Sequence, residues 1–165
     1  MQPPDPDDRV LSQQDIAAMT IEDGAFIDGS CTVVEPHGLI LRRGAYIGAE
    51  GFIDATGGVE IGEAVRISYR CMIISNTHHI SRSVWRRSRE GDRHRPVLIE
   101  RGCWLGAGVT LYPGVTVREG CVVNAGAVLS HSTEANGLYC PPSATRIKDL
   151  DITHDLPLEL AAEPA

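Results

Sequence analysis

An aliphatic residue recurs at intervals of six along most of this chain, and that spacing strongly limits the folds available to it. Two of the steps are eight residues long, and each of these falls in a stretch that contains glycine. The series stops after Ile73 and resumes at Ile99. Its members are Ile27, Val33, Leu41, Ile47, Ile53, Ile61, Ile67, Ile73, Ile99, Leu105, Leu111, Val117, Val123 and Leu129.

A second position supports the six-residue frame, because the fourth residue after nearly every aliphatic is small or β-branched, with His37 as the exception. A period of six matches neither the helical period of about 3.6 nor the strand period of about two. It matches a unit of one short strand and one tight corner, three of which close a coil. Coils of this kind stack through parallel hydrogen bonds about 4.8 Å apart. The pattern therefore predicts an all-β chain folded as a parallel β-helix with the aliphatic residues inside.

The same frame assigns a role to most of the cysteines. Cys31, Cys71, Cys103 and Cys121 occupy the small-residue position and are predicted to be compact packing groups. The sequence has no CxxC pair, so neither a zinc site nor a redox site is expected, and no metal is predicted. Cys140 lies outside the frame and has no assigned role.

Charge and hydropathy exclude some classes of partner. The formal net charge of −7 argues against a general affinity for nucleic acid or anionic lipid. No apolar run reaches the length of a membrane span, and the acidic, proline-rich opening MQPPDPDDRV is unlike a targeting peptide. These features predict a soluble cytoplasmic protein.

Two segments give the repeat a more specific meaning. PVLIERGCWLGAGVTLYPGVTVREGCVVNAGAVLS, and IDATGGVEIGEAVRIS with NTHHIS after it, resemble the left-handed parallel β-helix acyltransferases of the hexapeptide-repeat family. The likeness is to the branch of galactoside, maltose and capsular-polysaccharide O-acetyltransferases, and it covers about residues 26–148. It implies a short cap over 1–25, a β-helix domain over 26–133 with a loop at 80–96, and a tail or short helix over 134–165.

The resemblance also implies an activity. Members of this branch move an acetyl group from acetyl-CoA to a sugar hydroxyl, so a precursor of a surface polysaccharide or glycolipid is the expected acceptor, and a homotrimer the expected assembly. By position, the residues expected to bind the cofactor are Ser68, Trp104, Gly106, Ala107, Ala125, Ser130, Arg146 and Lys148. The N–H group of Ala107 is the expected oxyanion donor. Asp54, Thr56 and Trp85 are the candidates for binding the acceptor.

The histidine pair at the break in the repeat supplies the candidate base. Transfer to a hydroxyl needs a group that removes its proton, and neutral imidazole does so near neutral pH. The family's reactive histidine corresponds by position to His78. Adjacent residues of an extended chain point to opposite sides, so His79 is the alternative and only one of the two is expected to face the substrate.

The loop from Ser81 to Arg95 is predicted to be functional, because long loops inside compact repeats often are. It carries Trp85 and six arginines, and could fold over the groove of a neighbouring subunit. Its charge suits the phosphates of CoA, or an acceptor with a phosphate or carboxylate.

Three other interpretations remain open from the sequence. REGDRHRPVLIERG resembles a segment of the serine O-acetyltransferases and makes His94 an alternative site histidine, although Ala55 directly follows Asp54 where that family has a histidine. A zinc enzyme of the γ-carbonic anhydrase type would use His78, His94 and His131. A non-catalytic scaffold is the third, but a scaffold needs neither the histidine pair nor the long loop.

Overall fold

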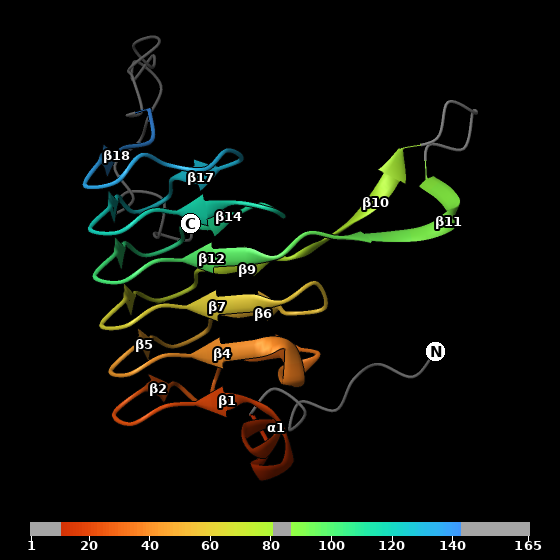
Figure 1. The fold of residues 1–165 in the computed structure, drawn as a ribbon, viewed down its shortest axis with the longest axis horizontal. Helices are drawn as coiled ribbons and strands as arrows, with labels where there is room; N and C mark the ends of the chain where they lie inside the picture. Colours follow the sequence, from red (N-terminus) through yellow and green to blue (C-terminus); the bar gives the residue numbers. More distant parts are fainter. Residues whose placement is uncertain (1–10, 81–86, 143–165) are drawn as a thin grey trace, which may run out of the picture.

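The computed structural model describes residues 11–80 and 87–142, with the side chains of these except 79–80 and 87–90. Short strands wind into stacked coils, which form the layers of Figure 1 from α1 at one end to β18 at the other. Three parallel sheets run along this stack, each built from strands of successive coils. The predicted parallel β-helix of hexapeptide repeats is confirmed.

We name the sheets A, B and C in the order in which the chain visits them. Sheet A contains β1 (Thr20–Ile21), β4 (Leu39–Leu41), β7 (Val59–Ile61), β12 (Val97–Ile99) and β15 (Thr116–Val117). Sheet B contains β2 (Phe26–Ile27), β5 (Tyr46–Ile47), β8 (Arg66–Ile67), β13 (Trp104–Leu105), β16 (Val122–Val123) and β18 (Leu138–Tyr139). Sheet C contains β3 (Thr32–Val34), β6 (Phe52–Asp54), β9 (Met72–Ile74), β14 (Thr110–Leu111) and β17 (Val128–Leu129).

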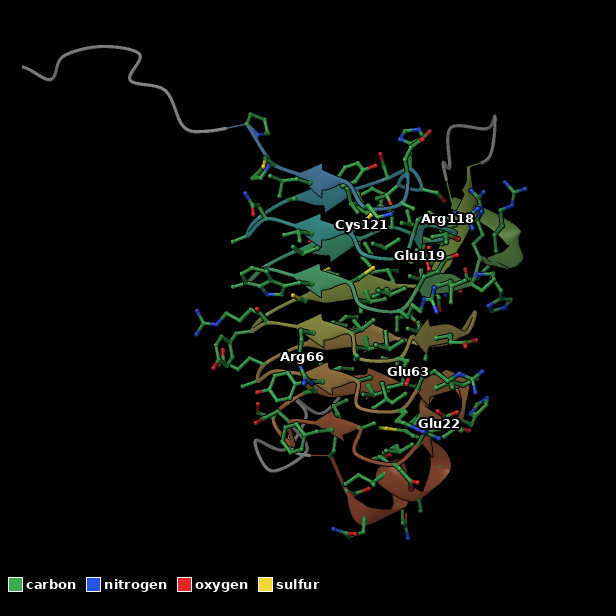
Figure 2. The ribbon with its side chains drawn as sticks, turned by 60° about the vertical axis from the view of Figure 1, so that its left-hand side comes forward. Glu22, Glu63, Arg66, Arg118, Glu119 and Cys121 are labelled. Atoms are coloured by element: carbon green, nitrogen blue, oxygen red, sulfur yellow. The ribbon has the colours of Figure 1, made fainter. Side chains whose placement is uncertain are left out.

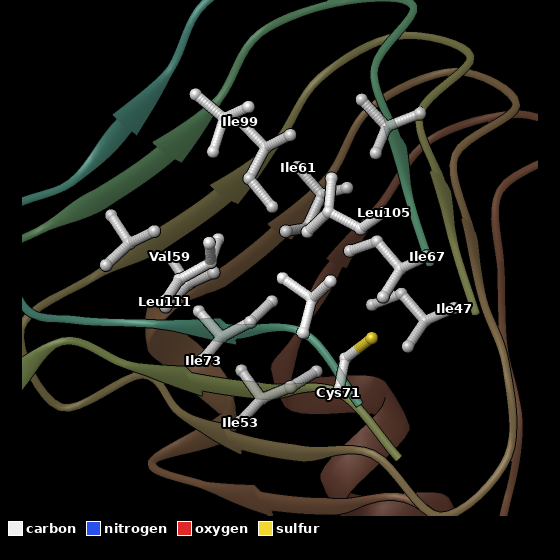
Figure 3. Packing of buried hydrophobic residues seen from close by; sticks show 14 of the residues in the cluster. Ile47, Ile53, Val59, Ile61, Ile67, Cys71, Ile73, Ile99, Leu105 and Leu111 are labelled. Atoms are coloured by element: carbon white, nitrogen blue, oxygen red, sulfur yellow. The ribbon is translucent and has the colours of Figure 1, made fainter. Parts of the chain in front are cut away.

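The core is made by the residues of the six-residue series. In sheet B, for example, Ile47, Ile67 and Leu105 pair in register from coil to coil and are all buried. Figure 3 shows these columns of aliphatic side chains meeting inside the coil. Every member of the series is buried except Ile27 and Val33, which are partly buried because they belong to the first coil.

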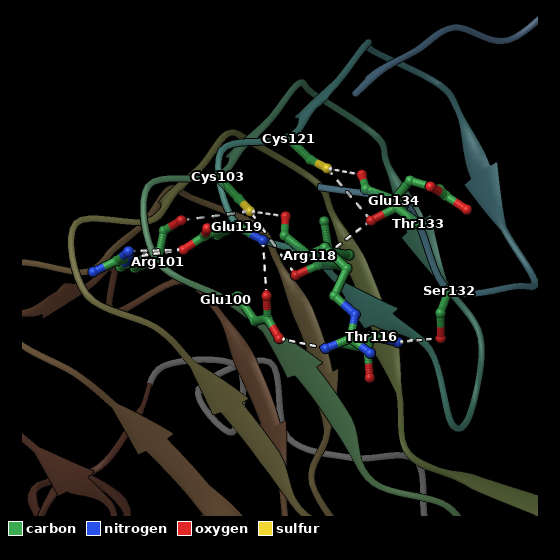
Figure 4. Close-up of polar contacts among 11 residues, drawn as sticks. Glu100, Arg101, Cys103, Thr116, Arg118, Glu119, Cys121, Ser132, Thr133 and Glu134 are labelled. Carbon is green, nitrogen blue, oxygen red and sulfur yellow. Dashed lines mark hydrogen bonds and ion pairs between the residues drawn. The ribbon is translucent and has the colours of Figure 1, made fainter. Parts of the chain in front are cut away.

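The cysteines of the small-residue position are buried and free, as predicted. Each thiol donates to a backbone carbonyl of the stack; the Cys121 Sγ lies 2.9 Å from the Glu134 oxygen, and the Cys103 Sγ 3.0 Å from the Arg118 oxygen (Figure 4). Burial raises the pKa of the Cys103 thiol to about 11. These thiols therefore pack the corners and are poor nucleophiles.

Two departures from the regular frame, His37 and the eight-residue step from Val33 to Leu41, have one local cause. His37, the exception at the small-residue position, lies exposed in the 3-10 helix η2 (Pro36–Gly38), which takes up one of the eight-residue steps. Gly38 is required there, because an added Cβ would lie 2.1 Å from the Ala55 oxygen. The described part of the cap contains one short helix, α1 (Gln13–Ala18), with Ser12 and Asp15 forming a capping box.

The predicted loop needs a correction, because most of it is regular structure. Strands β10 (Asn76–Ile80) and β11 (Arg87–His94) pair antiparallel as a two-stranded ribbon that projects from the coil (Figure 1). Thr77, which is at the small-residue position four residues after Ile73, is exposed in this ribbon. Ser75 is the last buried residue before the chain leaves the coil. Trp85 lies outside the described residues, and so does the part of the predicted tail or short helix over 143–165.

The edge between sheets A and B carries ion pairs that link successive coils. Arg118 Nη1 lies 2.9 Å from Glu100, whose other oxygen accepts the Glu119 N–H at 2.9 Å. Arg42 bridges Glu22 and Glu60 at 2.8 and 2.7 Å. Several of these side chains are labelled in Figure 2. The pKa of the Glu100 carboxyl is lowered, first by the Glu119 N–H and then by Arg118.

A carboxyl with a lowered pKa stabilises the fold above its unfolded-state pKa and loses that contribution as the pH falls through its folded-state value. We therefore expect Glu100→Gln to lower the unfolding temperature modestly at neutral pH, since exposed pairs contribute little. The difference from the parent should shrink as the pH falls from the unfolded-state value of about 4.3 through the lowered folded-state pKa of Glu100. Thermal unfolding of both proteins across this range tests the expectation, and a difference that grows in acid would contradict it.

Candidate active site

A cleft along the edge between sheets B and C is the candidate site. It has a volume of about 570 Å³ and crosses several coils near the carboxyl-terminal end of the stack. Its walls are formed by Ser68, Trp104, Gly106, Ala107, Val122, Val123, Asn124, Ala125, Cys140, Pro141 and Pro142. Successive coils contribute equivalent corner residues, so the cleft follows directly from the repeat.

Five of the residues predicted to bind the cofactor come together in this cleft: Ser68, Trp104, Gly106, Ala107 and Ala125. The Trp104 side chain, 55% exposed, stands on the outer face of β13 and forms one wall. At Gly106 an added Cβ would lie 2.6 Å from the Ala125 nitrogen, so only glycine fits between these two coils. The small side chains leave the backbone open to a ligand.

The backbone N–H of Ala107 is available to a ligand in this cleft. The carbonyl of the same residue accepts a hydrogen bond from the Gly126 N–H at 2.9 Å, which ties this corner to the coil above. Among the residues that the structure describes, none accepts a hydrogen bond from the Ala107 N–H. An exposed donor on a rigid corner can bind an oxygen that develops negative charge.

The other predicted cofactor residues lie elsewhere. Ser130 is at the edge between sheets C and A, where its Oγ is 3.0 Å from His131 Nδ1. Arg146 and Lys148 are outside the described residues. Sequence reasoning missed Asn124 and Cys140, which face each other in the cleft with Asn124 Nδ2 3.0 Å from the sulfur. The unassigned Cys140 is thus part of the cleft wall.

The candidate base lies on the ribbon. His78 is opposite Asp92 in the antiparallel register, and its Nδ1 is hydrogen-bonded to Asp92 Oδ1. The His78 side chain is about half exposed, so its ring remains open to a substrate. His94 pairs with Asn76 in the same register and is exposed. The side chain of His79 is outside the described set. Sequence analysis did not identify Asp92, although it lies in the GDRH segment.

The candidate acceptor residues lie beside the base of the ribbon. Asp54 is the last residue of β6, at the edge between sheets C and A from which the ribbon leaves one coil later. Its carbonyl accepts the Ser75 N–H at 3.0 Å. The Asp54 carboxylate accepts from the Thr56 N–H at 3.0 Å and from its hydroxyl at 2.5 Å. This local turn satisfies part of the carboxylate, while both side chains remain partly exposed.

The cleft and the ribbon occupy different edges of one coil. The chain passes the cleft between sheets B and C, and the ribbon leaves between sheets C and A. A single chain therefore presents a candidate base and a candidate cofactor cleft that are separated by sheet C.

Within residues 11–80 and 87–142, no three His, Cys, Asp or Glu side chains form a group suited to a metal ion. The described part of the chain also has no helix that is both long and apolar enough to cross a membrane.

Comparisons with known proteins agree with this architecture. The family model "bacterial transferase hexapeptide (six repeats)" matches residues 96–131. No curated protein matches the chain by sequence. A hexapeptide-repeat-containing acetyltransferase from Vibrio cholerae is similar in structure, with a TM-score of 0.70 and 19% identity, over 82% of this chain and 78% of that one.

Two further solved structures show the same likeness. For a maltose O-acetyltransferase from Clostridium difficile 630 the TM-score is 0.66 at 17% identity, over 75% of this chain and 65% of that one. For a galactoside acetyltransferase in complex with coenzyme A it is 0.67 at 19% identity, over 81% and 66%. This chain thus spans less than two thirds of the length of either protein. It carries the bacterial transferase hexapeptide repeat and shares the parallel β-helix fold of these acetyltransferases.

Proposed function

We propose that this chain is a CoA-dependent O-acetyltransferase that moves an acetyl group from acetyl-CoA to a hydroxyl of a sugar or glycan precursor. The observation that carries the proposal is the cleft between sheets B and C, where five residues expected to bind CoA line one surface. A surface-polysaccharide precursor is the acceptor that the resemblance favours, and the cytoplasm is the compartment in which acetyl-CoA would be met.

The reaction follows from the two candidate elements. His78 Nε2 removes the proton of the acceptor hydroxyl, whose oxygen attacks the thioester carbonyl. The Ala107 N–H donates to the oxyanion of the tetrahedral intermediate. When the carbon–sulfur bond breaks, the CoA thiolate takes the proton from the His78 imidazolium, which restores the base and leaves an acetyl ester.

Direct attack needs no acyl-enzyme. Four of the cysteines are buried, and Cys140, which lines the cleft, faces the amide of Asn124 and not a base. A nucleophilic cysteine is normally activated by a neighbouring base or cation. The proposal is therefore direct attack on the thioester, with His78 as the general base.

A homotrimer would bring the two edges together, with the ribbon of one copy beside the cleft of the next. Apolar side chains are exposed on the outer faces that flank the cleft: Phe26, Phe52, Met72, Trp104, Val128 and Leu138. Apolar surface of this extent on a small protein indicates contact with a partner. A closed ring of identical subunits would bury it and form equivalent sites.

The test is a transfer assay on the purified protein with acetyl-CoA and matched pairs of sugars, each with a hydroxyl or an amine at one carbon. Release of the CoA thiol should depend on the hydroxyl acceptor, and the product should carry an acetyl group that hydroxylamine removes. A product that resists hydroxylamine would indicate an amide and N-acyl transfer. Failure to bind acetyl-CoA would refute the proposal.

A further inference from the structure

The ribbon brings three polar side chains onto one of its faces. His78 and Asp92 are directly opposite each other, and Asn76 lies two residues before His78, so it points to the same side. Asp92 Oδ1 contacts His78 Nδ1, while Asn76 Nδ2 lies 3.5 Å from the other oxygen, Oδ2. One carboxylate therefore contacts the histidine and the amide at the same time.

The Asp92 carboxylate determines which nitrogen of the His78 ring carries the hydrogen. An ionised carboxylate can only accept hydrogen bonds, so the His78 nitrogen that faces it must carry the hydrogen. This leaves the lone pair of a neutral imidazole on Nε2, which points away from Asp92. A base needs that lone pair, so the contact selects the tautomer that can remove a proton.

The orientation of the Asn76 amide is also determined by Asp92. Turning the amide over would direct its oxygen at the carboxylate and cost a repulsive contact. In the observed orientation, Asn76 Oδ1 is buried and has no partner among the described residues. An unsatisfied buried acceptor is unfavourable and calls for an explanation. The explanation here is that the amide hydrogens are needed at Asp92 Oδ2.

We infer that Asp92, oriented by Asn76, is a positioning residue that holds His78 in the tautomer required of a base. The inference rests on the proposed function for its kinetic part, but the tautomer itself is independent of it. It also gives the ribbon a role, because only two paired strands can bring these residues together at a fixed register.

The inference predicts different results for the two partners of His78. Asp92→Asn keeps the shape but removes the charge, so nothing requires the ring hydrogen to stay on His78 Nδ1, and the tautomer with hydrogen on Nε2, which leaves no base there, becomes populated. Asn76→Ala keeps the carboxylate, so it should preserve the tautomer and affect only the orientation of Asp92.

The experiment measures kcat and the KM for acetyl-CoA in the full chain and follows the imidazole nitrogens by NMR. Because a general base contributes roughly 10²- to 10⁴-fold, we expect Asp92→Asn to lower kcat roughly 100-fold, with KM changed by less than about twofold. Asn76→Ala should lower kcat by roughly tenfold or less, since the carboxylate remains opposite His78. The NMR signals should show hydrogen on His78 Nδ1 in the parent and in Asn76→Ala, and a mixture of the two tautomers in Asp92→Asn.

Thr77→Ala is the matched control, since Thr77 lies on the same strand and faces the other side of the ribbon. It should leave kcat and the tautomer unchanged. An unchanged tautomer in Asp92→Asn, or a loss of kcat in Asn76→Ala as large as that in Asp92→Asn, would overturn the inference and leave the pair as a cross-strand contact that stabilises the ribbon. If the parent transfers no acetyl group, the proposed function fails, and the NMR result still decides the role of Asp92.

Discussion

Replacing His78 by alanine is expected to lower the kcat for acetyl transfer by about 10² to 10⁴, the range that a positioned general base contributes. The affinity for acetyl-CoA should not change, because the cleft lies at the other edge of sheet C and His78 is absent from its walls. Thiol release at saturating donor and titration calorimetry measure the two quantities separately.

His37→Ala is the control for this variant. His37 is in η2, far from the cleft and the ribbon in sequence, with a side chain 74% exposed and its Nδ1 3.4 Å from Glu35, so its loss should affect neither quantity. A normal kcat for His78→Ala would mean that the histidine takes no part in the chemical step. A protein that fails to bind acetyl-CoA would instead indicate that His78 shapes the donor site.

The second large effect is expected from filling the cleft. Ala125→Trp places an indole on an exposed corner of the cleft. This corner packs closely on the coil below, since a Cβ added at Gly106 would lie 2.6 Å from the backbone nitrogen of Ala125. The space for the donor is lost, and we expect acetyl-CoA to bind at least about 100-fold more weakly. The unfolding temperature should stay nearly constant, because Ala125 is not part of the core.

Thr20→Trp introduces the same side chain at an exposed position of β1, in sheet A at the opposite end of the stack. It should bind acetyl-CoA with the affinity of the parent. Equal affinities for Ala125→Trp and the parent would mean that the donor binds elsewhere, and the cleft would lose its assigned role.

The coil could be predicted from sequence because the residues that determine it are close together in the sequence and recur at a fixed interval. Each inward residue, such as Leu105, recurs at a fixed interval and stacks on its equivalents in the neighbouring coils. The same regularity places equivalent corners above one another, so the predicted cofactor residues of three successive coils share one cleft. Cys140 was not identified as a cleft residue because the spacing shortens in the last coil, where Tyr139 pairs with Val123 only sixteen residues earlier.

The ribbon could not be predicted in this way. The segment RSREGDRH of β11 is polar throughout, so it lacks the alternation that marks a half-buried strand. Its strand conformation comes from pairing with β10 and not from a core. The His78–Asp92 contact depends on that pairing register, which neither residue type nor spacing reveals.

The most direct test of a catalytic site shared between subunits mixes the two inactive proteins. A site built from the ribbon of one copy and the cleft of another requires His78 from one chain and Ala125 from its neighbour. Co-expression of differently tagged His78→Ala and Ala125→Trp chains should therefore restore about a third of the parental activity in trimers that carry both tags, since one of the three interfaces of every mixed trimer pairs two intact elements. Activity that stays at the level of the separate variants would contradict a shared site, and with it the pairing of His78 with the cleft of a neighbouring chain.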